Sequence, residues 1–193
     1  MTTQEDFLKR VSNALKNAGI QYMISGSIGS SFHGRPRATN DFDIIIAPDK
    51  KQLNTFINSL GEEYYLNIEA AMQAFAKNGM FNIIDLETGG KADLILRKNR
   101  NFSLVEFERR QKEKVLGLNL WIASPEDIIL SKLEWSEPRD DTQQFRDALG
   151  VAVVQWDSLD KDYIRKWAKE LNIENLLQQL LQQAEKITGG KQS

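Results

Sequence analysis

The sequence contains no cysteine and only one histidine among its 193 residues. The lack of cysteine excludes disulfide bonds, thiolate zinc sites and cysteine nucleophiles, and a single histidine excludes a metal centre built on several imidazoles. Any catalytic chemistry must therefore come from carboxylates, hydroxyl groups, lysine, arginine or the lone His33.

The chain also lacks a marked excess of charge of either sign and any long apolar run. Its 25 basic and 27 acidic residues give a net charge of −2, so no overall field attracts nucleic acid or an anionic membrane surface. No segment approaches the roughly 18 apolar residues that a membrane span requires, and the first residues are polar rather than basic and then apolar. We therefore expect a cytoplasmic protein with no membrane partner.

The residues that are present, 41% hydrophobic and 27% charged, are typical of a folded soluble domain. The first part of the chain mixes helical and strand patterns, whereas from Ser124 onward every pattern is helical. We expect an α/β (α+β) fold, with a mixed β-sheet flanked by helices over 1–123, a C-terminal helical lobe over 124–188 and a flexible tail over 189–193. The expected strands are 20–24, 41–47, 80–86, 91–96 and a bent pair within 114–123, and the expected helices are 6–18, 28–33, 49–60, 67–77, 102–110, 125–135, 141–155, 159–171 and 173–187.

Gly26 and Ser27 lie where a predicted strand passes into a predicted helix. Exposed backbone N–H groups and the helix dipole favour an anion such as phosphate at a turn of this kind. Glycine and serine are also ordinary turn and N-cap residues, so the pair alone leaves both interpretations open.

Asp41 and Asp43 begin a strand whose next residues are Ile44, Ile45 and Ile46. Residues two apart on a strand point to the same face, so the two carboxylates lie side by side and repel each other. A divalent cation relieves that repulsion, and Mg²⁺ accepts such oxygen ligands when phosphates supply the rest. The alternative is a pair of acids at the exposed start of a strand, each solvated by water.

A third carboxylate is available on a later apolar strand. Asp93 repeats the pattern of an acid followed by apolar residues, and it reaches the first pair if the two strands are neighbours. Asp85, on the preceding strand of the same predicted hairpin, is the competing candidate, and we favour Asp93 because its flanks match those of the first strand.

These features together resemble a known pattern. Gly26-Ser27, thirteen intervening residues, Asp41-Phe42-Asp43 and a later strand with Asp93 are similar to the nucleotidyltransferase superfamily, which has a polymerase beta-like fold. More narrowly, the chain resembles the AbiEii-like bacterial nucleotidyltransferases, a group that includes toxins of toxin–antitoxin systems. The segments that carry this narrower resemblance are 24–27, 33–43, 124–127 and 132–135, and the spacer is at the long end of the superfamily's range.

The resemblance implies a mixed α/β core that bears a metal site and a helical lobe that closes over a nucleotide. It implies that Asp41 and Asp43 hold Mg²⁺ or Mn²⁺, and that Asp93 is a third ligand or the base. It assigns Gly26 and Ser27 to the triphosphate and gives Lys132 the task of neutralising phosphate charge.

The function that the resemblance implies is the transfer of NMP from an NTP, such as ATP, to a hydroxyl group. The acceptor is expected on RNA, protein or a small molecule, and the toxin relatives add a cognate antitoxin as a partner. Metal ions suit this reaction because they stabilise the attacking and leaving oxygens, and carboxylates suffice as their ligands. The alternative is a catalytically silent nucleotide- or protein-binding module on the same fold.

Several cations and aromatic residues have two interpretations. Arg35 and Arg37 contact phosphate oxygens or the acceptor, or else lie in a solvated loop. Lys132 binds phosphate, or extends its aliphatic stem along apolar surface. The segment 97–114, with seven basic and three acidic residues, is a nucleic-acid patch or a solvated face. We expect the four tryptophans, Trp121, Trp135, Trp156 and Trp167, to anchor the core of the helical lobe, and base stacking is the alternative role for one of them.

Overall fold

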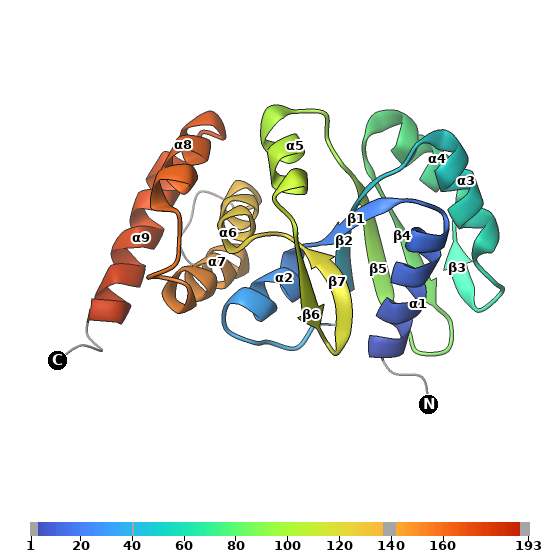
Figure 1. Cartoon of the computed structure of the whole chain (residues 1–193), viewed down its shortest axis with the longest axis horizontal. Helices are drawn as coiled ribbons and strands as arrows, with labels where there is room; N and C mark the ends of the chain where they lie inside the picture. Colours follow the sequence, from blue (N-terminus) through green and yellow to red (C-terminus); the bar gives the residue numbers. More distant parts are fainter. Residues whose placement is uncertain (1–3, 40, 137–141, 190–193) are drawn as a thin grey trace. The chain divides into compact units, whose positions relative to one another are not determined.

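The computed structural model describes residues 4–39, 41–136 and 142–189, which fold into two compact units (Figure 1). The first unit is built from 1–25 and 39–122, and the second from 26–38 and 123–193. The boundary expected from the sequence lies after residue 123, with 26–38 in the α/β part, whereas the structure groups 26–38 with the helical residues. Of the expected tail, Gly189 ends the last helix and residues 190–193 lie outside the described part of the chain.

The first unit contains a seven-stranded mixed sheet with the strand order β3-β4-β5-β2-β1-β7-β6. The two parallel pairs are β2 with β5 and β1 with β7, and the other neighbours are antiparallel. The expected α/β fold with a mixed sheet is thereby confirmed. The strands are β1 (Gln21–Ile24), β2 (Asp41–Ala47), β3 (Tyr64–Leu66), β4 (Met80–Asp85), β5 (Lys91–Leu96), β6 (Gln111–Val115) and β7 (Leu118–Ile122).

Helix α1 covers one face of this sheet (Figure 1). Phe7, Val11 and Leu15 recur at spacings of four, are fully or almost fully buried and form its apolar stripe. The ring of Phe7 packs against that of Phe42 on β2, with 5.9 Å between the ring centroids. The helices of the first unit are α1 (Gln4–Asn17), α3 (Lys50–Ser59), α4 (Ile68–Lys77) and α5 (Asn101–Glu108).

The two faces of β2 differ in character. Phe42, Ile44 and Ile46 are at most 1% exposed and point toward the core shared with α1. Asp41 and Asp43 alternate with them and therefore lie on the other face, which is more exposed along this strand. Burial of one face thus fixes the orientation of the acids on the other.

Every regular element among the described residues of the second unit is a helix. Three of its helices begin with a side chain that accepts a hydrogen bond from a backbone N–H group of the first turn, namely Ser124, Thr142 and Asp160. Leu130, Phe145 and Trp167 are buried in its core. The helices are α2 (Gly26–His33), α6 (Pro125–Glu134), α7 (Gln143–Val154), α8 (Lys161–Glu170) and α9 (Glu174–Gly189).

Some sequence predictions were wrong. Strand β3 was missed, because three residues are too few to show alternation. Strand β6 begins at Gln111 rather than near residue 114, because its residues are mostly polar and exposed. Of the four tryptophans only Trp167 is buried in the helical unit, since Trp156 is half-buried, Trp135 is 70% exposed and Trp121 lies on β7 of the sheet.

Gly34 allows a close backbone approach within the second unit. A Cβ atom at this position would lie 2.7 Å from the backbone nitrogen of Val151 and 2.9 Å from the carbonyl carbon of Gly150. Because backbone atoms cannot rotate away, we expect Gly34→Ala to lower the free energy of unfolding by about 1–3 kcal/mol. Urea denaturation followed by circular dichroism measures this change.

Gly79→Ala is the matched control, because its added Cβ would lie 3.6 Å from its nearest neighbour, an ordinary contact. Equal free energies of unfolding for Gly34→Ala and the wild-type protein would show that the backbone at Gly34 can move away from Gly150 and Val151 without cost.

Candidate functional site

The predicted carboxylates lie on two neighbouring strands. The parallel register of β2 and β5 pairs Asp43 directly with Asp93 and Asp41 with Lys91. Paired residues of adjacent strands point to the same face of a sheet. The backbone therefore brings Asp41, Asp43 and Asp93 together on one face, as the sequence analysis anticipated if these strands were neighbours.

Asp93 is buried, with 8% of its surface exposed, and its two carboxylate oxygens differ. Oδ2 accepts a hydrogen bond from the Lys91 ammonium group at 2.9 Å, whereas Oδ1 is buried without a hydrogen-bond partner among the described residues. The hydrogen bond to Asp93, together with the negative charges of Asp93, Asp41 and Asp43, raises the pKa of Lys91 above its ordinary value. The ammonium group of Lys91 thus offsets part of the negative charge of Asp41, Asp43 and Asp93.

Asp85 lies on the opposite face. In the β4–β5 register Asn82 is paired with Asp93, so Asp85, three residues further on, points the other way. Its fully buried carboxylate accepts hydrogen bonds from Arg10 and from the backbone N–H groups of Glu87 and Thr88. Asp85 therefore closes the β4–β5 turn and is not near the pair on β2.

The residues on this face fit a hard divalent cation. Three carboxylates supply the oxygen ligands that Mg²⁺ prefers, and the unpartnered Oδ1 of Asp93 is a buried acceptor that a cation would satisfy. Within the described residues, however, no three acidic or histidine side chains converge closely enough to form a ready-made metal cluster. The backbone register is in place, and the ligand role of the three side chains stays a prediction.

Gly26 and Ser27 begin helix α2, directly after Ser25, whose N–H group donates to the Asp43 carbonyl at 2.9 Å. Gly26 has a φ of +54°, a conformation that side chains disfavour and that explains a glycine at this turn. The Ser27 hydroxyl accepts a hydrogen bond from the Arg37 guanidinium at 2.5 Å. Two of the predicted phosphate-binding residues are therefore in direct contact.

Arg37 and Lys132 meet at one carboxylate. Asp147 accepts hydrogen bonds from Arg37 Nε at 3.2 Å and from Lys132 Nζ at 3.1 Å. The side chains of Lys132 and Asp147 are only 7% and 6% exposed. Arg37 lies in an exposed segment, as the solvated-loop interpretation expects, but it is also ion-paired, and Lys132 is buried in an ion pair rather than only extended along apolar surface.

Burial by itself would raise the pKa of Asp147. Hydrogen bonds from Arg37 and Gln143, together with the charge of Lys132, outweigh burial and lower the pKa below its ordinary value. The carboxylate is thus held in its charged form. No local sequence pattern marks Asp147 as the shared partner of two cations that lie 110 and 15 residues away along the chain.

Arg35 lies with Arg37 and Arg146 at a cavity of about 370 Å³ within the second unit. Its other walls include the apolar side chains of Leu149 and Val153. Three guanidinium groups face one carboxylate, Asp147, in this lining, so the cavity suits an anionic ligand with an apolar part. The sequence had identified Arg35 and Arg37 but not Arg146.

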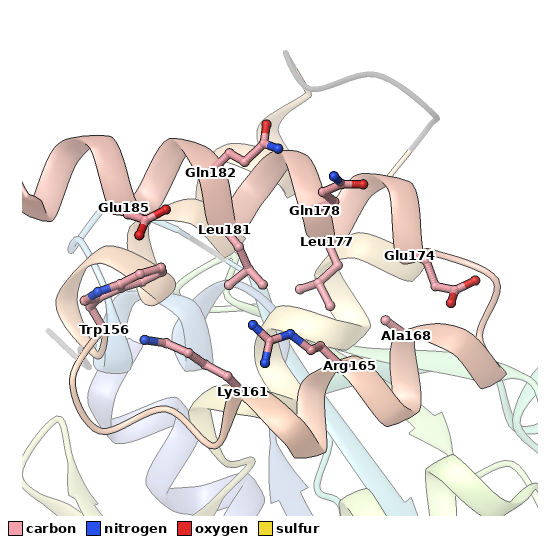
Figure 2. A pocket seen from close by; sticks show the side chains of 10 residues that line it. All are labelled: Trp156, Lys161, Arg165, Ala168, Glu174, Leu177, Gln178, Leu181, Gln182 and Glu185. Carbon is pink, nitrogen blue, oxygen red and sulfur yellow. The ribbon is translucent and has the colours of Figure 1, made fainter.

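A second cavity of about 510 Å³ lies between helices α8 and α9. Figure 2 shows Lys161 and Arg165 along α8, with Glu174 and Glu185 at opposite ends of the facing stretch of α9. The Lys161 ammonium group lies 3.9 Å from the centroid of the Trp156 ring. None of the predicted site residues lines this groove.

His33 has a structural role. It is buried, with 6% of its surface exposed, and its Nε2 lies 2.8 Å from the carbonyl oxygen of Ala123, to which it donates. Its own carbonyl accepts a hydrogen bond from Gln155. Both contacts tie the end of α2 to other segments of the second unit.

Comparison with known proteins gives a fold but no sequence relative. No protein-family model matches the chain, and no curated protein matches it in sequence. The crystal structure of an antigenic nucleotidyltransferase-like protein from Paracoccidioides brasiliensis matches with a TM-score of 0.64 at 14% identity, over 96% of this chain and 90% of that one. The solution structure of the antibiotic-resistance factor ANT(2'')-Ia matches with a TM-score of 0.52 at 11% identity, over 84% of this chain and 89% of that one. The chain therefore has a nucleotidyltransferase-like fold.

These matches agree with the broader resemblance found in the sequence. The narrower AbiEii-like resemblance stays a prediction. In the described part of the chain, no helix is both long enough and apolar enough to cross a membrane.

The buried pair of Lys132 and Asp147 gives a test of the second unit. Asp147→Ala leaves the Lys132 ammonium group buried without its partner, and removing one member of a buried pair costs about 3 kcal/mol or more. We expect this loss in the free energy of unfolding measured by urea denaturation. Asp162→Ala is the control, because Asp162 forms an exposed pair with Arg165 and its loss should cost less than about 1 kcal/mol. Similar stabilities for the two variants would contradict the network.

The lowered pKa of Asp147 also predicts a pH dependence. A carboxylate whose pKa is lower in the folded than in the unfolded state stabilises the fold above the unfolded value of about 3.9, and this contribution disappears as the pH falls through the folded value. We expect the wild-type protein to lose more free energy of unfolding than Asp147→Asn between about pH 6 and pH 3. Urea denaturation of both proteins at each pH measures this difference. Equal losses of the free energy of unfolding would refute the lowered pKa of Asp147.

Proposed function

We propose that this chain is a Mg²⁺- or Mn²⁺-dependent nucleotidyltransferase that transfers NMP from an NTP to a hydroxyl acceptor. The observation that carries the proposal is the β2–β5 register, which sets Asp43 beside Asp93 and leaves the Oδ1 atom of Asp93 buried without a partner. The nucleotidyltransferase-like fold of the chain supports it.

In the proposed reaction the acceptor oxygen attacks the α-phosphorus of the NTP. The bond between this phosphorus and the oxygen that bridges the α- and β-phosphates breaks, and pyrophosphate leaves. Asp41, Asp43 and Asp93 would hold the cation, which when bound stabilises charge on the attacking and leaving oxygens. Asp93 is the alternative acceptor for the proton of the attacking hydroxyl. Lys91 would limit the repulsion among the carboxylates, because its ammonium group already binds Asp93.

The second unit supplies the groups proposed to bind the triphosphate. The N–H groups at Gly26 and Ser27 begin α2, and Arg37, which donates to Ser27, brings positive charge to that turn. Lys132 shares Asp147 with Arg37, so phosphate oxygens would compete with a carboxylate for the same two cations. Arg35, at the cavity beside them, is the further cation proposed for phosphate or acceptor.

The acceptor and the biological setting belong to the proposal as well. RNA, protein and small molecules all offer hydroxyl groups, and one fold neighbour is described as an antibiotic-resistance factor. The AbiEii-like resemblance favours a toxin with a cognate antitoxin as partner, in the cytoplasm. Incubation of the protein with each labelled NTP, Mg²⁺ and a cell extract, followed by fractionation into RNA, protein and small molecules, identifies the acceptor class.

Asp41→Asn, Asp43→Asn and Asp93→Asn test the carboxylate assignment. Each substitution keeps the side-chain size and removes a charged ligand, so we expect transfer to fall at least about a thousandfold, equivalent to several kcal/mol of barrier. Label incorporation measured with and without EDTA reports this loss. Circular dichroism checks that the fold is kept.

Asp162→Asn, which removes an exposed carboxylate outside the proposed site, is the activity control and should retain the wild-type rate. Full activity of the Asp41 and Asp43 variants would refute the enzyme. Calorimetry then decides the alternative: nucleotide binding without turnover would identify a silent binding module on the same fold.

A further inference from the structure

Arg97 and Arg110 form a pair of cations in the first unit that the proposed reaction does not use. Arg97 directly follows β5, and Arg110 lies between α5 and β6. Both stack on the ring of Phe107, with the guanidinium carbon of Arg97 5.3 Å and that of Arg110 4.3 Å from the ring centroid. Arg110 also lies 5.2 Å from the ring of Trp121. One aromatic ring therefore holds two like charges close together.

The partners of these two arginines carry no net negative charge. Arg110 donates to the Phe107 carbonyl and, at 3.4 Å, to the side-chain oxygen of Gln21. The Nε atoms of Arg97 and Arg110 are both buried without a hydrogen-bond partner among the described residues. Neither guanidinium group forms an ion pair with a carboxylate in the described part of the chain. Buried donors of this kind are rare in folded proteins and call for a ligand that accepts from them.

The electrostatics of the pair agree with this view. Burial and the charge of Arg97 lower the pKa of Arg110 below its ordinary value, and the charge of Glu108 offsets only part of that effect. Aromatic rings and carbonyl groups stabilise a guanidinium group but do not neutralise it. A bound anion would remove the mutual repulsion of the two arginines.

The pair lies apart from the carboxylate site. The N–H group of Arg97 donates to the Ile46 carbonyl at 2.9 Å, at the far end of β2 from Asp41 and Asp43. Asp93 and Arg97 are four residues apart along β5, which corresponds to about 13 Å. A single phosphate group cannot contact both sites, so the two are separate.

The surroundings of the pair are basic and partly exposed. Lys112 and Lys114 are exposed on the edge strand β6, and Lys112 is paired in register with Trp121, which is 38% exposed. Guanidinium groups bind phosphate through parallel N–H donors, and lysines add longer-range attraction. Tetrahedral, multiply charged phosphate therefore fits this place better than a neutral ligand.

We propose that Arg97 and Arg110 form a phosphate-binding site, separate from the carboxylate site, for free phosphate or for the backbone phosphate of a single-stranded polynucleotide. The shared chemistry is a phosphate oxygen that accepts from both guanidinium groups. This site does not depend on the proposed transferase activity.

Calorimetry with the full chain tests the site in EDTA, at constant ionic strength, so that no divalent cation takes part. The two probes are inorganic phosphate and a short single-stranded thymidine oligonucleotide. We expect Arg97→Gln and Arg110→Gln each to weaken binding of the effective probe about tenfold or more, because each removes a charge-assisted hydrogen-bond donor. Equal affinities for both variants and the wild-type protein would overturn the site.

The controls remove the same charge elsewhere. Lys51→Gln on α3 and Arg165→Gln on α8 should bind the probe like the wild-type protein. If they lose as much affinity as the site variants, the loss reflects the lower net charge of the protein, and the proposed site is overturned. No side-chain hydrogen bond joins Arg97 to another described residue, so Arg97→Gln stays informative even if Arg110→Gln unfolds. Binding of phosphate alone supports a free-anion site, and tighter, salt-sensitive binding of the oligonucleotide supports a backbone site.

Failure of this site and failure of the proposed function are distinguishable. Asp41→Asn should bind the same probe as tightly as the wild-type protein while losing transfer. An inactive wild-type protein with an Arg97-dependent phosphate affinity would refute the transferase and leave this site standing.

Discussion

The parallel pairing of β2 with β5 is the constraint on which the proposed chemistry depends. On one face of the sheet the register stacks Ile44 on Leu94 and Ile46 on Leu96, all buried, so a slip of one residue would turn these side chains toward the other face. The same register sets Asp43 beside Asp93 on the opposite face. Apolar packing, rather than any attraction between the acids, thus holds the carboxylates together against their repulsion.

In the second unit a single carboxylate orders the cations. Asp147 binds Arg37 and Lys132, and Arg37 in turn donates to Ser27 at the start of α2. Without Asp147 the side chains of Arg37 and Lys132 would sample many rotamers, and binding an anion would cost more conformational entropy. The carboxylate reduces that loss, but it also competes with phosphate. The triphosphate proposed to bind here carries more negative charge than the one carboxylate with which it would compete.

The sequence predicted elements well where one periodicity extends over several turns or a whole strand. Strand β2 was predicted over the residues it occupies, because Asp41 and Ala47 bracket a β-branched run that Pro48 ends. Asp93 was chosen over Asp85 from its flanks, and the register places only Asp93 beside Asp43. Long-range pairing was beyond the sequence: nothing local to Asp147 reveals Arg37, and nothing local to Arg97 reveals Arg110. The grouping of 26–38 with the helical unit depends on close packing such as that at Gly34, which has no periodic signature.

The stability that Asp93 costs the fold bears on the choice between an enzyme and a catalytically silent module. The fold itself needs only a residue of suitable size there, since its neighbours Ala92 and Leu94 already supply the buried face. A buried oxygen without a partner lowers stability by about 1–3 kcal/mol relative to a satisfied or apolar group. Two further acids on the same face add repulsion to that cost. A sheet used only as a scaffold gains nothing from the unpartnered oxygen of Asp93, whereas the cation proposed for this face would offset its cost.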